Sequence, residues 1–276
     1  DFSSSGLENP LTHLLLVVFL VLFIKNEYTL QRLFILSLVA CLGTLNRQDC
    51  ILFYIFPLLY AWSKVEDKRR GVIFIFLGFI PLLLWGIFSV IYYGFPFPNT
   101  AYAKLGAGVW KGDLFLQGLR YYQWTWNWDL ITLLVIFSGI ITAFSRYEPK
   151  VWALSVGIIL YCIYVLRIGG DFMGSRFFTA PMVVSTFIIL RWSRFDRLYY
   201  GIPAVLLFLF SSFIQPYVPV FTDSSFGENK KEFEASFENN IGNERMFYFA
   251  HSSLVKWRKG KPMPDNGWAN SGREYR

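Results

Sequence analysis

Three charged residues, Arg167, Asp171 and Arg176, lie on a glycine-rich stretch between two apolar segments, in the sequence RIGGDFMGSRFF at 167–178. A guanidinium presents a planar fork of N–H donors that matches phosphate oxygens, so Arg176 is a candidate phosphate ligand. Gly169 and Gly170 are expected to end the preceding helix, and Asp171 to cap a short turn. The same residues also fit a simpler interpretation, in which an ion pair between Asp171 and Arg176 braces the loop.

A second charged pair interrupts the apolar sequence at LNRQDC, residues 45–50. Four polar residues join two apolar segments here, so Arg47 and Asp49 are expected at or near membrane depth. A charged side chain at the centre of a membrane helix costs about 2.5–3.5 kcal/mol on insertion scales, so such residues are candidates for function. The alternative is a tight turn in which Arg47 and Asp49 pair with each other.

The motif GLENP, residues 6–10, precedes the first apolar segment. Glu8 is a candidate substrate ligand because it lies at the edge of that segment. An ordinary helix start explains the motif equally well, with Asn9 as the cap and Pro10 in the first helical position.

The stretch YYGFPFPNTAYAKLG, residues 92–106, holds two prolines that favour an extended chain. Asn99 and Thr100 follow and can cap a short helix, whose N-terminal N–H groups and dipole attract phosphate. Lys104 lies one turn later. Capping alone requires no ligand, so this motif indicates a substrate site only in combination with the others. The aromatic run at 121–128 fits a belt at the membrane interface better than a sugar-stacking platform.

The composition indicates a membrane protein. Of 276 residues, 54% are hydrophobic, 20% are aromatic and only 16% are charged, which is more apolar surface than a soluble domain can bury. The net charge of +7 does not predict nucleic-acid binding, because 11 of the 26 Lys and Arg residues lie in four short loops between apolar segments. The three cysteines and two isolated histidines show neither a disulfide framework nor a zinc-binding pattern.

The apolar segments predict an all-α polytopic membrane protein. Several are shorter than the ~20 residues that cross ~30 Å of hydrocarbon, so they must tilt, borrow flanking residues or thin the bilayer. We expect residues 1–214 to form the membrane core. Residues 215–276 would form a small tail that either covers the site or is a flexible or truncated end. The eight segments are residues 11–24, 33–45, 50–62, 72–92, 130–144, 151–166, 179–190 and 202–214.

Basic residues mark alternate loops. The set at 25–32, 63–71, 145–150 and 191–197 carries 11 Lys and Arg residues. The other set, at 1–10, 46–49, 93–129 and 167–178, is about twice as long and carries 6. Cytoplasmic loops are enriched in Lys and Arg, so the first set is predicted to be cytoplasmic. The four motifs with unusual chemistry, the N-terminal stretch and the tail then lie on the extracytoplasmic side.

Four motifs in the same order resemble the membrane-embedded GT-C glycosyltransferases. They are SSGLENPL, NRQD, YGFPFPNTAYAKL and RIGGDFMGSRFF, and the resemblance covers about residues 3–181. Within this group, the chain resembles the mycobacterial terminal β-(1→2) arabinofuranosyltransferase family and its bacterial relatives. NRQD departs from the Arg-Pro-Asp-like turn of that family, because it lacks the proline.

The resemblance implies a GT-C type helical bundle of about eight transmembrane segments in the bacterial plasma membrane. Such an enzyme takes a sugar, which the resemblance implies to be arabinofuranose, from a polyprenyl-phosphate donor and transfers it with inversion to a cell-envelope glycan. Its partners would be that donor, that acceptor and membrane lipid. The alternative class is a transporter or flippase for a lipid-linked glycan.

The site residues follow from the same resemblance. Family members carry the catalytic acidic residue in their first outer loop, which we expect to lie in an N-terminal part that this chain lacks, so no base is assigned. No metal or other cofactor is expected, because no DxD-like pair faces outward. The predicted substrate ligands are Glu8, Arg47, Asp49, Asn99, Thr100, Lys104, Asp171 and Arg176.

Overall fold

A computed structural model describes residues 7–25, 27–97, 102, 108–192, 237–243 and 267–274, with side chains omitted for 267–270. This part of the chain is helical, with two isolated β-bridges and no longer strand. Most of these helices coincide with predicted apolar runs, and Gly169 ends α9 as expected. The helices are α1 (Asn9–Ile24), α2 (Leu30–Asn46), α3 (Ile51–Lys64), α4 (Lys68–Gly78), α5 (Ile80–Tyr93), α7 (Lys111–Trp128), α8 (Leu130–Phe144), α9 (Pro149–Ile168), α10 (Thr179–Trp192) and α14 (Gly267–Glu274), with the short 3₁₀ helices η1 (Gln48–Cys50) and η2 (Arg176–Phe178).

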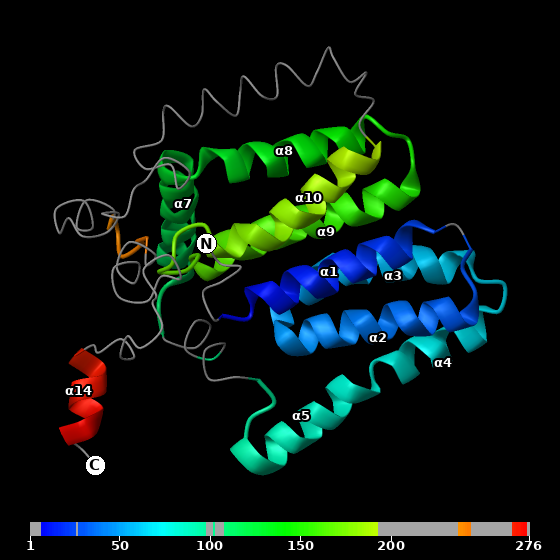
Figure 1. The fold of residues 1–276 in the computed structure, drawn as a ribbon, viewed down its shortest axis with the longest axis horizontal. Helices are drawn as coiled ribbons and strands as arrows, with labels where there is room; N and C mark the ends of the chain where they lie inside the picture. Colours follow the sequence, from blue (N-terminus) through cyan, green and yellow to red (C-terminus); the bar gives the residue numbers. More distant parts are fainter. Residues whose placement is uncertain are drawn as a thin grey trace, which may run out of the picture.

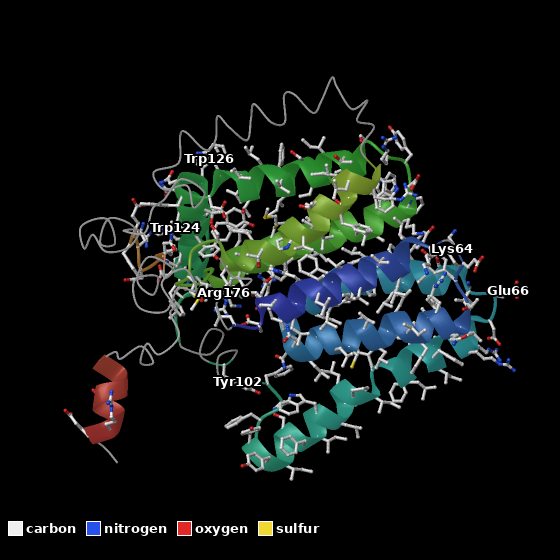
Figure 2. All side chains as sticks on the ribbon, in the orientation of Figure 1. Lys64, Glu66, Tyr102, Trp124, Trp126 and Arg176 are labelled. Atoms are coloured by element: carbon white, nitrogen blue, oxygen red, sulfur yellow. The ribbon has the colours of Figure 1, made fainter. Side chains whose placement is uncertain are left out.

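Helices α1, α2, α3, α9 and α10 run back and forth beside one another, so the loops alternate between two ends of the bundle (Figure 1). The basic loops at 27–32, 63–71 and 145–150 gather at one end, and residues 47–50 and 169–178 at the other. Figure 2 shows Lys64 and Glu66 at the first end and Arg176 at the second. The separation of the two sets of loops is confirmed for these described loops. Residues 193–197 of the fourth basic loop lie outside the described residues. The compartment that each end faces stays a prediction.

Helix length limits how many of the expected spans the structure supports. Within the described residues, α9 alone has the length and composition to cross a membrane, and up to three spans result if each bent pair, α4 with α5 and α7 with α8, counts as one. Helices α1 and α2, of 16 and 17 residues, are apolar but rise only ~24–26 Å. The expected number of eight is therefore too high on this criterion. The eighth segment, 202–214, lies outside the described residues.

The outer surface of the bundle is nevertheless apolar. Large hydrophobic side chains such as Leu84, Ile91 and Leu190 are more than 60% exposed. A soluble monomer rarely exposes apolar surface of this extent. The core contains aromatic and aliphatic side chains from several helices, including the fully buried Phe19, Tyr54 and Ile158. Together these features are consistent with a helical membrane protein.

Helix α7 corrects the expectation of a loop over 93–129. It is 18 residues long and lies across the end of α8, α9 and α10 (Figure 1). Its aromatic residues are not simply an interfacial belt: Tyr121 and Trp124 are buried, whereas Trp126 is 59% exposed. Helix α7 was not predicted because its sequence mixes polar and apolar residues and contains no long apolar run. The buried side of α7 supports the loop at 169–178.

The crossing of α7 and α9 depends on a glycine. A Cβ atom at Gly118 would overlap the backbone carbonyl group of Leu166, whereas a Cβ atom at Gly86, inside α5, would meet no atom within 4 Å. Gly118→Ala is therefore expected to lower the free energy of unfolding by about 1–3 kcal/mol. Gly86→Ala, the matched control, should be neutral or stabilise by up to about 1 kcal/mol. Thermal unfolding in detergent compares the two, and equal melting temperatures would refute the close crossing.

Candidate functional site

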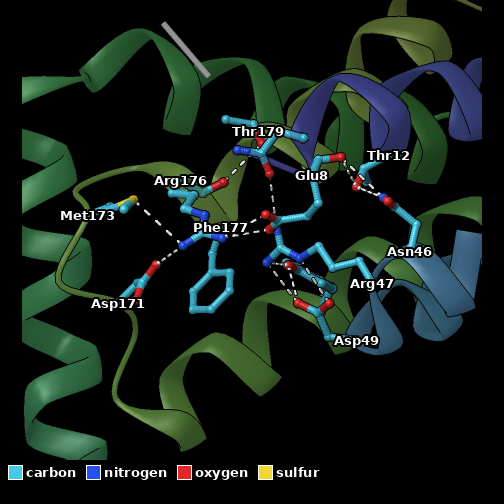
Figure 3. Close-up of polar contacts among 12 residues, drawn as sticks. Glu8, Thr12, Asn46, Arg47, Asp49, Asp171, Met173, Arg176, Phe177 and Thr179 are labelled. Atoms are coloured by element: carbon cyan, nitrogen blue, oxygen red, sulfur yellow. Dashed lines mark hydrogen bonds and ion pairs between the residues drawn. The ribbon is translucent and has the colours of Figure 1, made fainter. Parts of the chain in front are cut away.

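Five of the predicted ligands come together at one end of the bundle (Figure 3). Glu8 precedes α1, Arg47 and Asp49 lie between α2 and α3, and Asp171 and Arg176 lie between α9 and α10. Their charges alternate in space, in the order Asp171, Arg176, Glu8, Arg47 and Asp49. Three loops that are distant in sequence therefore build one polar network.

Arg176 bridges two carboxylates. Its Nη2 donates to both carboxylate oxygens of Glu8, at 2.7 and 2.9 Å, and its Nη1 donates to Oδ2 of Asp171 at 3.1 Å. The ion pair that the sequence offered as an alternative is therefore present, but Arg176 makes a second contact to Glu8. Its Nε is buried without a hydrogen-bond partner in the described part of the chain.

Two glycines shape the loop that carries Arg176. Gly169 and Gly170 have φ values of 80° and 70°, in the left-handed region that favours glycine. As predicted, they end α9, and the N–H of Gly170 donates to the carbonyl of Val165 at 3.0 Å. Ser175 precedes η2 without a side-chain capping bond, and the Asp171 carboxylate accepts a hydrogen bond from Arg176. The capping role of Asp171 stays a prediction.

Helix α7 and the tail hold the outer side of this loop. The Tyr121 hydroxyl donates to the carbonyl of Met173 at 3.0 Å and accepts from the N–H of Phe177 at 3.1 Å. From the tail, Gly242 exchanges backbone hydrogen bonds with the loop: its N–H donates to Phe172 and its carbonyl accepts from Gly174. The loop that positions Arg176 is therefore fixed on two sides.

Arg47 is held more deeply. Only 7% of its surface is exposed, and Nε and Nη2 donate to the two oxygens of Asp49 at 3.0 and 2.9 Å. The Tyr161 hydroxyl accepts from Arg47 Nη2 at 2.8 Å and donates to Asp49 at 2.7 Å. The guanidinium carbon also lies 4.7 Å from the centroid of the Phe177 ring, within the range of a cation–π contact. The paired turn predicted as the alternative is thus present and is part of a larger network.

Asn9 does not cap α1 as the sequence suggested. The capping position belongs to Glu8, which makes no side-chain capping bond, and Pro10 lies in the first turn as expected. Asn9 is buried and its side-chain oxygen accepts from Arg47 Nη1 at 3.2 Å. A buried guanidinium that needs acceptors explains why this amide faces inward.

Glu8 connects the two arginines. Its carboxylate contacts Arg176 directly and lies 3.7 Å from Arg47 Nη1. Burial by itself would raise the pKa of Glu8, but a backbone hydrogen bond and the two nearby guanidiniums outweigh it and hold that pKa below its usual value. With Glu8 ionised, the network contains three carboxylates and two guanidiniums, so it is anionic by one charge.

A cavity of about 820 Å³ opens beside the network. All five charged residues of the network line it. Aromatic residues also line it, from α5, α9, the segment after α5, the 169–178 loop and η2: Trp85, Tyr93, Phe95, Phe97, Tyr164, Phe172 and Phe177. Its volume is in the range of small-molecule sites. This combination of charged and aromatic side chains suits a ligand that carries both a charged and an apolar group.

Sequence reasoning missed several residues of this site. Tyr161 and Trp85 each lie within an apolar segment. Tyr93, Phe95 and Phe97 belong to the motif at 92–106, but only Asn99, Thr100 and Lys104 of that motif were predicted as ligands. Three predicted ligands, Asn99, Thr100 and Lys104, lie outside the described residues.

Comparison with known proteins finds one significant likeness among curated proteins. The chain is 28% identical over 217 residues to the terminal β-(1→2)-arabinofuranosyltransferase of Mycobacterium tuberculosis. The aligned part is 66% of this chain and 34% of the relative, so the chain spans about a third of that protein. No family model and no solved structure matches.

Proposed function

We propose that the protein is a membrane glycosyltransferase that uses a polyprenyl-phosphate sugar as donor. The observation that carries the proposal is the cavity lined by both charged and aromatic side chains. Arg47 and Arg176 suit a phosphate, and the aromatic residues suit the first part of a lipid chain. The likeness to an arabinofuranosyltransferase supports sugar transfer and makes arabinofuranose the first sugar to test.

The proposed reaction is a single displacement with inversion. The acceptor hydroxyl oxygen bonds to the anomeric carbon while the bond from that carbon to the phosphate oxygen breaks. The phosphate leaves with the bonding electrons, and a carboxylate base takes the hydroxyl proton. Negative charge grows on the leaving phosphate, where Arg47 and Arg176 are placed to stabilise it.

The wider proposal concerns fold and location. We propose a GT-C type bundle over residues 1–214 in a bacterial plasma membrane, with the network at the extracytoplasmic end and a cell-envelope glycan as acceptor. Nucleotide sugars are not supplied outside that membrane, so a lipid-anchored donor suits this end. The contact of the tail residue Gly242 with the loop at 172–174 supports placing the tail on the same side as the site.

Transfer of radiolabelled sugar tests the proposed function. The full-length protein, purified in detergent, is incubated with a synthetic polyprenyl-phosphate arabinofuranose and an arabinan acceptor. Labelled product is expected with the lipid-phosphate donor and not with a nucleotide-linked pentose. Failure with pentose and hexose donors, together with movement of the labelled lipid across vesicle membranes, would replace the proposal with a transporter.

Cysteine labelling tests the proposed side of the site. Phe172 is 52% exposed at the end that holds the network, and Ser145 is exposed at the opposite end, whereas Ser175 is too buried to serve. With Cys162 replaced by serine, Phe172→Cys is expected to react with an impermeant thiol reagent added to intact cells. Ser145→Cys, the control, should react only after the cells are opened. The reverse pattern would place the site on the cytoplasmic side.

A further inference from the structure

Glu8 is the carboxylate that both arginines share. Arg176 donates to both of its oxygens, and Arg47 Nη1 lies 3.7 Å from Oε1. The two guanidiniums therefore converge on the Glu8 carboxylate, in the manner in which two arginines converge on a bound anion. The Glu8 carboxylate lines the cavity, so it occupies the position that an entering phosphate would take between the two arginines.

Glu8 is also the most exposed of the three carboxylates of the network. Its side chain is 26% exposed, against 9% for Asp49 and 4% for Asp171. Asp49 is further held by Tyr161 and by two bonds from Arg47. Glu8 has a longer side chain and stands at the start of α1, so its carboxylate can move away while the other two remain.

Charge makes this movement necessary. The network is already anionic by one charge, and a phosphate that entered beside an ionised Glu8 would meet a like charge at the two cations that it needs. Like charges brought together in a partly buried site repel strongly. An anionic ligand must therefore displace Glu8 from the arginines or bind weakly.

We propose that Glu8 is an internal competitor for the two arginines: it occupies them in the empty site and returns to them when the lipid phosphate leaves. The inference rests on the proposed function, because it takes a polyprenyl phosphate as the ligand. In the donor, the phosphate is a diester with one negative charge. After transfer, it is a monoester with about −1.5 to −2 charges at pH 7, which Glu8 repels more strongly. Glu8 therefore promotes release of the spent lipid.

Binding of polyprenyl phosphate to the full-length protein in detergent tests the competition. Glu8→Gln keeps the shape of the side chain but replaces charged hydrogen bonds to Arg176 with neutral ones of about half the strength. The affinity for polyprenyl phosphate is expected to rise about 10-fold, and the affinity for the uncharged polyprenol should not change. Glu66→Gln, at the opposite end of the bundle, removes the same charge and should alter neither affinity.

A second variant covers the case in which Glu8→Gln does not fold. Glu8→Asp keeps the charge but withdraws the carboxylate by one methylene, so it should also tighten polyprenyl phosphate binding, to a smaller extent. Unchanged or weaker binding in a folded Glu8 variant would overturn the competition, even if sugar transfer is observed. Tighter binding without sugar transfer would support the competition for an anionic lipid and contradict the proposed reaction.

Discussion

Replacing Arg176 with alanine is expected to lower the rate of sugar transfer by about 100- to 1000-fold, because loss of one charge-stabilising donor from a preorganised site typically costs that much. Arg176 lines the cavity and can reach a phosphate from a loop fixed by Tyr121 and Gly242. The measurement is turnover at saturating polyprenyl-phosphate donor, with the melting temperature of each variant in the same detergent.

The Arg176→Ala variant alone does not show whether Arg176 binds phosphate or only stabilises the loop. Arg176→Ala would leave Glu8 and Asp171 without the guanidinium that bridges them, so the fold would also lose stability. Arg176→Lys retains one positive charge for these carboxylates but loses the planar fork. It should preserve most of the melting temperature and still lower turnover by more than about 10-fold. Arg120→Lys, the same exchange at an exposed position of α7, is the matched control and should leave turnover unchanged.

A different result is expected if the Asp171–Arg176 ion pair only stabilises the loop. If Arg176 only braced the loop against Asp171, each alanine variant would lower stability by a similar amount. The double variant would then be no worse than either single variant. Equal loss of stability in Asp171→Ala and Arg176→Ala, with turnover of Arg176→Lys close to that of the unmodified protein, would contradict the phosphate role.

Loop charge was sufficient to predict that Glu8, Arg47 and Arg176 share one end of the bundle, because alternate loops of such a chain face the same way. Their pairing could not be predicted. Glu8 and Arg176 are 168 residues apart, and each arginine has an acidic residue within five positions that offered a simpler partner. Only the packing of α1 against α10 brings Glu8 to Arg176.

Other parts of the site carried no signal in the sequence. Tyr161 lies within an apolar run, where a tyrosine is usually a core residue, and its hydroxyl acquires a role only because α9 packs against α3 beside Asp49. Helix α7 has too little apolar character to be recognised as part of the bundle. The short α1 and α2 also show why eight apolar segments did not predict eight full spans: hydrophobicity locates a helix, but its ends depend on caps and neighbours.

Arg47→Ala is expected to lower the free energy of unfolding by about 3–5 kcal/mol, because removal of one partner leaves the other charge buried and uncompensated. Asp49 is 9% exposed and accepts two hydrogen bonds from Arg47, and the Tyr161 hydroxyl would not neutralise its charge. Thermal unfolding in detergent should show a melting temperature lower by on the order of 10 °C.

An exposed pair in the same chain provides the control. Arg70 Nε lies 3.4 Å from Asp67 Oδ2 at the opposite end of the bundle, and the side chains of Arg70 and Asp67 are 70% and 47% exposed. Arg70→Ala should change the free energy of unfolding by at most about 1 kcal/mol, because water already solvates both charges. Similar melting temperatures for Arg47→Ala and Arg70→Ala would refute the buried network. A large drop confined to Arg47→Ala would show that Arg47 is needed for stability, so that lost sugar transfer in this variant would not by itself indicate a phosphate contact. Arg176→Lys is therefore the sharper test of phosphate binding, since it changes the donor geometry without removing a buried charge.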